Sequence, residues 1–353
     1  MNIPFFDLTR QSKTSEVEIF QAITEVQSSG TFILSQRVAT FETEFAKYLG
    51  IDHCITCGNG TDALEMSLEA LGIKAGDEVL LPSFGWISPY MAVKRCGATP
   101  VLVEVDPITG NILSDDISNK ITTRSKAVIA IHLFGNPCDI IPIKTICDAK
   151  GLFLIEDCAQ AHGAAVAGQK CGSFGDVAIF SFYPTKNLGA WGDGGAVVTN
   201  NVELAGKIRS LRHYCKQGDR FQGIGRNSRL DEIQAAILLV KLKYLDKWNE
   251  RRITIARRYQ EVIGCPINAS SVYHQFTLKV TDRAEFQKKL LNKGIGTAVH
   301  YPFVVSSVEE DGRLTNAQIL VDTIVSLPIF PELMEEEIFY ICEHLDLLRK
   351  YIL

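Results

Sequence analysis

Two reactive side chains follow segments that have the pattern of buried strands. The apolar run 153–155 leads to Glu156 and then Asp157. A second apolar run, 178–182, leads into a loop that carries Lys186, and a glycine-rich turn at 192–195 follows. Because the carboxyl ends of parallel strands meet at one edge of a sheet, where α/β proteins bind ligands, we expect the Asp157 carboxylate and the Lys186 amine to lie close together. Such a lysine can bond covalently to a carbonyl group beside a fixed negative charge.

A glycine-rich loop, GNGTDAL at residues 58–64, joins a strand pattern to a helix pattern. Its glycines allow the backbone to approach a ligand closely, and the free N–H groups of a helix start attract an anion. The same loop fits the dinucleotide fingerprint G-x-G-x-x-A. A dinucleotide site needs an acid about 20 residues further on, at the end of the second strand, whereas Asp77 and Glu78 precede the next strand pattern. A phosphate site, a dinucleotide site and a plain helix start all remain open at this point.

The combination of lysine, carboxylate and anion-binding loop fits pyridoxal 5′-phosphate (PLP). This cofactor needs a lysine for its Schiff base and a carboxylate that keeps the pyridine nitrogen protonated, so that the ring accepts electrons. For the phosphate anchor the sequence offers Gly60, Thr61 and Ser181. For stacking on the ring it offers Trp86 or Phe84. Taken singly, each residue has a plain structural explanation, such as a turn acid, a solvated lysine or a core tryptophan, but their order at successive strand ends favours PLP.

The first two thirds of the chain alternate between helix and strand patterns. Helix patterns at 15–28 and 38–48 are each followed by a glycine that can end a helix. Short apolar runs bounded by Gly, Pro or Asp are typical of a parallel sheet covered on both faces. We therefore predict an α/β domain over residues 1–244, with a mostly parallel sheet sandwiched by helices. The expected strands are 53–57, 78–81, 100–105, 127–133, 153–156, 177–181 and 196–199, and the helices between them include 61–71 and 87–95.

A smaller α+β domain is predicted for residues 245–353. The stretch 230–263 has a helical pattern without Gly or Pro, so it can lead the chain out of the first domain. The pattern beyond it predicts a strand at 273–280, a helix at 283–292, a strand at 296–300 and a C-terminal helix near 335–345.

Composition and charge argue against several classes of protein. A formal net charge of −5 over 353 residues gives no indication of a nucleic-acid surface. No apolar run approaches the roughly 20 residues of a membrane helix, and the first residues lack a signal-peptide pattern. Ten scattered cysteines are typical of buried free thiols in a reducing compartment. The CxxC pair Cys54 and Cys57 lies in an expected strand and lacks the second pair of a zinc site. We expect a cytoplasmic protein without a metal centre.

Six blocks of sequence resemble the DegT-type nucleotide-sugar aminotransferases, a family of PLP fold type I within the aspartate aminotransferase superfamily. The likeness extends from residues 3–8 to residues 326–331 and covers almost the whole chain. It implies a large α/β domain that binds PLP and a smaller C-terminal α+β domain. The blocks are GNGTDAL from Gly58, PSFGW from Pro82, IEDCAQAHGA from Ile155, FSFYPTKNLGAWGDGGAVVTN from Phe180, GRNSRLDEIQAA from Gly225 and HYP from His300.

The resemblance implies a role for each matching residue of the cofactor site. Lys186 would carry the Schiff base and shuttle the proton, and Asp157 would pair with the pyridine nitrogen. Gln160 would hydrogen-bond the ring oxygen, Trp86 would stack on the ring, and Asn227 would reach the phosphate held by a neighbouring subunit, which implies a homodimer with shared active sites. The phosphate contacts would be Gly60, Thr61 and Ser181, and the contacts to the nucleotide-sugar would be Gly30, Phe32, Thr185, Arg229, His300 and Tyr301.

The reaction that the resemblance implies takes an amino group from L-glutamate and transfers it to a keto-sugar carried on a nucleoside diphosphate. The stretch KNLGAWGDGGA, from Lys186, is similar to the branch that acts at C3 of a 3-keto-6-deoxyhexose, often dTDP-linked. Amination at C4 and a UDP-linked 3-keto sugar remain alternatives. So does a regulatory or binding protein that keeps the fold without turnover. Relatives that dehydrate the sugar carry histidine in place of Lys186, and a NAD-dependent enzyme would leave Lys186 unexplained.

Two departures from the family pattern concern the sugar pocket. The family commonly has Thr where Gly85 stands in this chain. After the His300 block, a Pro-rich and His-containing continuation is replaced by FVVSS at residues 303–307. Both departures leave the cofactor residues intact.

Overall fold

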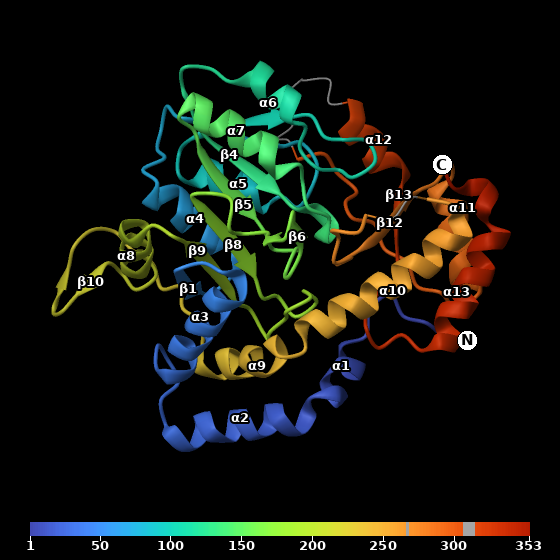
Figure 1. Ribbon diagram of the computed structural model, residues 1–353, viewed down its shortest axis with the longest axis horizontal. Coiled ribbons are helices and arrows are strands. Elements are labelled where there is room, and N and C mark those ends of the chain that lie inside the picture. The colour runs from blue at the N-terminus through green and yellow to red at the C-terminus, as the bar shows by residue number, and fades with distance from the viewer. Residues whose placement is uncertain (266–267, 306–314) are drawn as a thin grey trace.

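The centre of the molecule is a seven-stranded sheet in the order β1-β9-β8-β5-β4-β2-β3 (Figure 1). The structure is a computed structural model that describes residues 1–265, 268–305 and 315–353. Strand β9 runs antiparallel to both of its neighbours, and the other pairings are parallel. The strands are β1 (His53–Cys57), β2 (Glu78–Pro82), β3 (Thr99–Val103), β4 (Ser125–Ile131), β5 (Phe153–Asp157), β8 (Val177–Ser181) and β9 (Gly195–Thr199).

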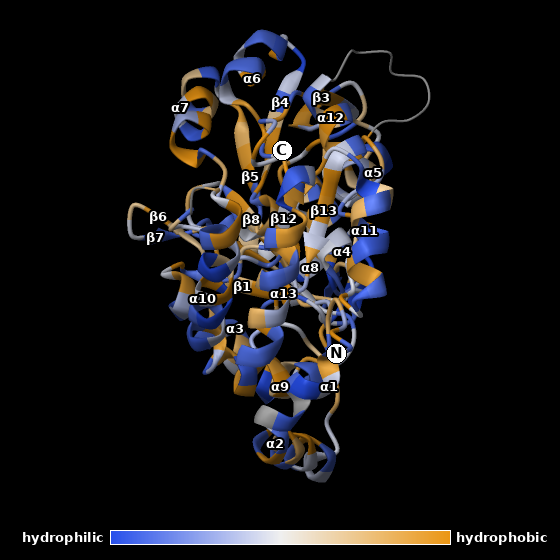
Figure 2. Ribbon diagram, turned by 90° about the vertical axis from the view of Figure 1, so that its right-hand side faces the viewer, coloured by the Kyte–Doolittle hydropathy of each residue, from blue (hydrophilic) through white to orange (hydrophobic). Residues whose placement is uncertain are grey.

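Helices cover both faces of this sheet because successive strand residues point to opposite sides and both sides are apolar. In β5, Leu154 belongs to a core that includes α7, whereas Ile155 belongs to a core that includes α4 and α5. The alternation continues to the strand end, so Glu156 lies on the α7 side and Asp157 on the α4 side. Figure 2 shows the apolar strands enclosed by helices with polar outer faces. The predicted fold, an α/β sandwich with a mostly parallel sheet, is confirmed.

Two glycines end the first long helices, as the sequence predicts. Gly30 after α2 and Gly50 after α3 both adopt left-handed backbone angles. The helices of this part are α1 (Leu8–Thr14), α2 (Glu16–Ser29), α3 (Gln36–Leu49), α4 (Gly60–Ala70), α5 (Ser88–Arg95), α6 (Ser114–Lys120), α7 (Ile140–Lys150), α8 (Val202–Leu211) and α9 (Glu232–Leu242), with a 3-10 turn at Leu133–Gly135.

Two short hairpins branch from the loops. One pairs β6 (Ala165–Val166) with β7 (Gln169–Lys170). The other pairs β10 (Lys216–Gln217) with β11 (Arg220–Phe221) and projects away from the body of the molecule (Figure 1).

The predicted continuous helix at 230–263 is wrong, since the structure has two helices that separate at Lys243 and Tyr244. Helix α9 packs against α2 and α3, whereas α10 (Leu245–Ile263) packs against the C-terminal helix α13 (Glu335–Leu347). A straight helix could not reach both cores, and no Gly or Pro marks the break. Helix α10 crosses from the sheet to the C-terminal part of the chain (Figure 1).

The C-terminal part builds its own core around an antiparallel pair of strands, β12 (Phe276–Lys279) and β13 (Ile324–Leu327). The predicted strand at 296–300 is wrong, because only a single bridge joins Ala298 to Ser326. Ile3 enters this core and forms a bridge with Ile295. The division of the chain after residue 244 stays a prediction. The remaining elements are α11 (Arg283–Asn292), α12 (Thr315–Thr323) and a 3-10 turn at Arg349–Tyr351.

Within the described residues, no helix combines the length and the apolar character needed to cross a membrane.

Candidate active site

One cavity of about 530 Å³ at the carboxyl ends of the strands collects most of the predicted site residues. A larger hollow of about 730 Å³ lies between α2, α3 and α9 and contains none of them. Four predicted residues, Gly30, Phe32, Asn227 and Arg229, do not line the cavity. Those that do are Gly60, Thr61, Trp86, Asp157, Gln160, Ser181, Thr185, Lys186, His300 and Tyr301.

Lys186 is presented by a tight turn that follows β8. Its backbone N–H donates to the Tyr183 carbonyl over 2.9 Å. Three residues later the chain folds back so closely that a Cβ on Gly189 would meet the Pro184 oxygen at 2.3 Å, which makes glycine obligatory there. Burial lowers the pKa of the Lys186 amine to about 8, and Asp157 acts in the opposite direction. About a tenth of the amine is therefore unprotonated, and thus nucleophilic, at pH 7, far more than for a lysine with the ordinary pKa.

Asp157 is a buried carboxylate of the cavity, and its side of β5 is the side of α4. The residue is 6% exposed, and its Oδ1 accepts the Ala159 backbone N–H over 3.0 Å. Burial raises the pKa of the Asp157 carboxyl, while the Ala159 N–H and Lys186 act to lower it. A protonated ring nitrogen placed here would pair with this carboxylate in a medium of low dielectric, where the attraction is strong.

Gln160 and two aromatic rings form the wall next to Asp157. The Gln160 side chain accepts the Phe134 N–H over 2.6 Å and donates to the Tyr301 hydroxyl over 2.8 Å, so its orientation is fixed. The Trp86 ring lies 5.7 Å from the Tyr301 ring, yet Trp86 is 54% exposed and keeps a free face. Phe84, the other predicted stacking residue, is fully buried and does not line the cavity. Of the two predicted stacking residues, Trp86 is therefore the one available to a ligand.

The start of helix α4 provides an anion site, and glycines let its backbone lie close to β8 and β9. A Cβ on Gly60 would meet Cβ of Ser181 at 2.9 Å, and a Cβ on Gly195 would meet the Asn59 carbonyl carbon at 2.4 Å. Thr61 contributes a hydroxyl that pairs with the Ser88 hydroxyl. Backbone N–H groups and hydroxyls at a helix start suit a phosphate. With Lys186 and Asp157 in the same cavity, the residues present fit PLP.

Three histidines near Lys186 are neutral at physiological pH. Burial and the Lys186 charge lower the pKa of His162 to about 3 and that of His300 to about 4. The same two causes, with further cations, put the pKa of His274 well below its usual value. His300 is held by the Ser326 hydroxyl over 2.8 Å. His274 was not foreseen, because it comes from the segment before β12, far away in the sequence.

The cavity has further lining residues that the sequence did not single out. Asn59 caps α4 by accepting the Asp62 N–H over 2.8 Å, a role its place after Gly58 could have revealed. Asp193 belongs to the glycine-rich turn that follows Lys186. The others include Ser88, Tyr183 and Gln275.

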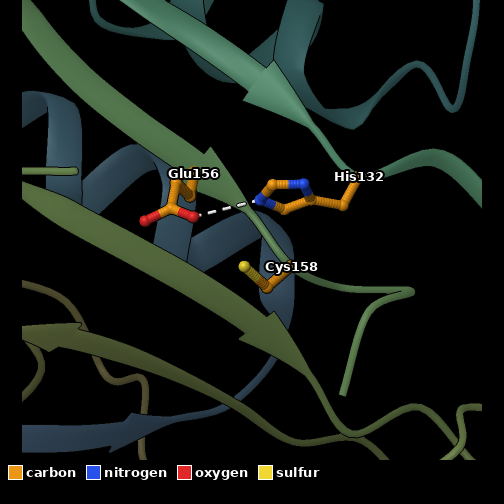
Figure 3. Close-up of side chains that lie close together, drawn as sticks. All are labelled: His132, Glu156 and Cys158. Atoms are coloured by element: carbon orange, nitrogen blue, oxygen red, sulfur yellow. Dashed lines mark hydrogen bonds and ion pairs between the residues drawn. The ribbon is translucent and has the colours of Figure 1, made fainter. Parts of the chain in front are cut away.

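Glu156, Asp157's neighbour, points to the opposite side of the sheet and belongs to a buried polar cluster with His132 and Cys158 (Figure 3). The Glu156 carboxylate accepts backbone N–H groups of Gly172, Phe174 and Gly175 over 2.9, 2.7 and 2.8 Å. It also lies 3.0 Å from His132 Nε2. His132 Nδ1 accepts the Cys138 N–H over 3.1 Å, so the proton is on Nε2. Because these bonds occupy the imidazole and the carboxylate, the cluster anchors the loop at 172–175.

We expect Glu156→Gln to reduce the free energy of unfolding by about 1–3 kcal/mol, since an amide NH₂ would face backbone donors and leave a buried N–H without an acceptor. Urea unfolding followed by circular dichroism measures this loss. The matched control is Glu343→Gln, at an exposed position of α13, which should change the value by no more than about 0.5 kcal/mol. Equal stability of both variants would show that the cluster is not an anchor.

Comparisons with known proteins agree with this geometry. The chain is 44% identical to a dTDP-3-amino-3,6-dideoxy-alpha-D-galactopyranose transaminase of Aneurinibacillus thermoaerophilus, over 97% of this chain and 98% of the relative. It is 40% identical to a UDP-N-acetyl-3-dehydro-alpha-D-glucosamine 3-aminotransferase of Acidithiobacillus ferrooxidans, over 95% of each. The structure matches S. venezuelae DesV, solved in complex with a ketimine intermediate, with a TM-score of 0.96, 38% identity and 99% coverage of both chains.

A family model gives the same assignment over nearly the whole length. Residues 13–346 match the model described as the DegT/DnrJ/EryC1/StrS aminotransferase family. The predictions of the family, the enzyme class and the cofactor are confirmed. The chain belongs to the DegT/DnrJ/EryC1/StrS aminotransferase family, and it is a PLP-dependent sugar aminotransferase that acts on nucleotide-linked keto-sugars.

Proposed function

We propose that this enzyme transfers the amino group of L-glutamate to C3 of a dTDP-linked 3-keto-6-deoxyhexose. The observation that carries the chemistry is the single cavity in which Lys186, Asp157 and the start of α4 meet. Both relatives described above have names that place the amino group at C3, one on a dTDP-sugar and one on a UDP-sugar. These names favour C3 over C4, and the UDP-linked 3-keto sugar is the second candidate.

The residues of the cavity divide the work of this reaction. PLP, when bound, supplies an electron sink and a carrier for the amino group. Lys186 would hold it covalently and then move a proton at the substrate carbon, because its lowered pKa lets its amine both accept and release a proton near neutral pH. Asp157 would keep the ring nitrogen protonated, and Gln160, already fixed by Phe134 and Tyr301, would bond the ring oxygen. The phosphate contacts would be Gly60, Thr61 and Ser181, and Trp86 would cover the ring.

The sugar-nucleotide contacts divide into two groups by position. Thr185, His300 and Tyr301 line the cavity and would contact the sugar. Gly30, Phe32 and Arg229 lie elsewhere, and Phe32 accepts the N–H of Glu232 at the start of α9 over 3.0 Å. We place these three at the site of a second subunit, as the next observation supports.

We also propose a homodimer whose active sites combine residues of both copies. Among the described residues that line the cavity, Lys186 is the single lysine or arginine, although a cofactor phosphate and a nucleoside diphosphate must be held there. Asn227 is exposed and bridges His213 at the base of the projecting β10–β11 hairpin. In that hairpin region Phe221 is 66% exposed and Ile224 is 91% exposed. An arm of this kind would bury its apolar side chains by reaching a partner.

Mixing two defective variants tests the shared site. Lys186→Ala lacks the amine, and Asn227→Asp places a carboxylate beside the phosphate and should weaken PLP retention by charge repulsion. A mixed dimer would contain one site with both native residues, so coexpression of the two variants should restore turnover well above that of either alone. The control is coexpression of two copies of the Lys186→Ala variant that carry different tags. No recovery in mixed dimers that are shown to form would contradict the shared site.

A substrate panel tests the reaction. The enzyme with L-glutamate is offered dTDP- and UDP-linked sugars that carry a keto group at C3 or C4, and mass spectrometry detects replacement of the carbonyl oxygen by an amine. We expect the dTDP-linked 3-keto sugar to give the highest kcat/KM. Preference for a 4-keto sugar would overturn the position, and preference for UDP would select the second candidate.

The product and its compartment complete the proposal. An amino-sugar nucleotide is an activated glycosyl donor, so we place its use in the synthesis of a surface polysaccharide, such as a lipopolysaccharide O-antigen, or of a glycoside. All ten cysteines are free, including the CxxC pair Cys54 and Cys57, which supports a reducing compartment such as the cytoplasm.

A further inference from the structure

Asn187, the residue directly after Lys186, is held by hydrogen bonds through both the nitrogen and the oxygen of its side-chain amide. It is 2% exposed. Its Nδ2 donates to Asn249 Oδ1 over 2.9 Å and to the Val272 carbonyl over 3.2 Å. Its Oδ1 lies 3.1 Å from Nδ1 of His274. The two donations identify the nitrogen of the Asn187 amide, so its oxygen must be the acceptor for the His274 ring.

The His274 ring is therefore held in one tautomer, with the proton on Nδ1. The ring stays neutral, because burial and the charges of Lys186 and Arg252 put its pKa well below the usual value. His274 is 5% exposed and lines the cavity. Because the ring does not change its protonation state near neutral pH, its hydrogen bond to Asn187 is kept over that pH range.

The segment that carries His274 also holds the loop that orients Gln160. Val272 N–H donates to the Gly135 carbonyl over 2.9 Å, and Gln275 N–H donates to the Phe134 carbonyl over 3.2 Å. Phe134, whose φ is 62°, in turn donates its own N–H to Gln160. The short stretch 272–275 before β12 thus connects the turn of Lys186 to the loop beside Asp157.

We propose that His274 is a positioning residue for Lys186, acting through the hydrogen bond from its Nδ1 to Asn187. The inference rests on the proposed role of Lys186 and extends it to a side chain from the far end of the chain. The backbone bond from Lys186 to Tyr183 holds one side of the turn, and the His274–Asn187 bond holds the other. Without the second, the turn can rotate the amine out of the cavity and into water.

The test compares two amides at position 274. Asparagine places its NH₂ where Nδ1 stands and can still donate to Asn187, whereas glutamine places its amide where Nε2 stands and cannot. The readout is acetylation of Lys186 by acetic anhydride in the cofactor-free protein, followed against pH by mass spectrometry, together with the rate of PLP capture. We expect His274→Gln to raise the pKa of Lys186. Near neutral pH, each unit by which that pKa rises should lower both rates about tenfold. His274→Asn should stay within about twofold of the native rates.

Further variants separate this role from a purely structural one. Asn187→Ala removes the same bond from the other side, so it should slow capture like His274→Gln, and the double variant should add little. If His274→Gln does not fold, Asn187→Ala carries the test. The control His344→Gln removes a buried imidazole that bonds the Tyr340 carbonyl over 2.8 Å, and it should leave Lys186 acetylation unchanged. Native acetylation in His274→Gln or Asn187→Ala would overturn the inference, whereas a native enzyme that cannot capture PLP would overturn the proposed function instead.

Discussion

Lys186→Ala is expected to reduce kcat for amine transfer by roughly 10⁴-fold or more, because the variant loses both the covalent attachment point and the proton shuttle. The loss should appear in both half-reactions, measured in single turnovers as 2-oxoglutarate from L-glutamate and as amino sugar from the keto-sugar. Cofactor binding should persist without a covalent bond, because Asp157 and the start of α4 are intact. Equilibrium dialysis with PLP measures that binding.

A matched control separates the chemistry of Lys186 from its charge. Lys186→Arg keeps a cation beside Asp157 but cannot serve as a nucleophile or shuttle the proton, because guanidinium does not lose its proton in proteins. Both variants should be equally inactive if the amine itself is required. Turnover close to the native rate in either folded variant would remove Lys186 from its proposed role.

The pH dependence of PLP capture follows from the depressed pKa of Lys186. The unprotonated amine is the reactive form, so the rate should rise with pH up to about 8 and then level off. A lysine with the ordinary pKa of about 10.4 would keep gaining rate well beyond that point. Stopped-flow absorbance between pH 6 and pH 10 distinguishes the two curves, and a rate that still climbs tenfold per pH unit at pH 9 would show that Lys186 is not buried as described.

The sequence was sufficient for the residues that follow strands. Strand β8 has the bounds that its pattern predicts, and strand β5 ends at Asp157 as expected within one residue. Because the strands are parallel and adjacent, their ends bring Asp157 and the Lys186 turn together without further information. The glycine-rich start of α4 lies near them because it, too, directly follows a strand of the same sheet, β1.

The remaining parts of the site depend on packing between distant segments. Nothing in the short apolar pattern around His274 indicates that it lies beside Lys186, because that contact is set by the path of α10 towards the C-terminal core. The predicted strand at 296–300 failed for a related reason, since that segment carries His300 and Tyr301 into the cavity instead of extending a sheet. Of the segment 303–307, which departs from the family pattern, residues 306 and 307 lie outside the described part of the chain. The Phe303 ring packs against the Trp86 ring, with 6.3 Å between the ring centres.

The carboxylate partner of the ring nitrogen has the second largest expected effect. Asp157→Asn keeps the size of the side chain and an oxygen that can accept the Ala159 N–H, but it removes the charge. Losing an opposite charge at hydrogen-bonding distance lowers the pKa of a cationic ring nitrogen by about 1–3 units. Since each unit changes the protonated fraction tenfold, kcat should fall between about 10-fold and 10³-fold.

The cofactor-free Asp157→Asn protein offers an independent measurement of the same charge. Asp157 raises the pKa of Lys186 against the effect of burial, so its removal should move the acetylation curve of Lys186 to lower pH. Asp157→Glu is the matched control, because it keeps the charge and should leave that curve closer to the native one. A variant that loses turnover while its Lys186 curve stays in place would mean that the carboxylate and the amine do not share the cavity as the structure places them, and the assignment of Asp157 to the ring nitrogen would fail with it.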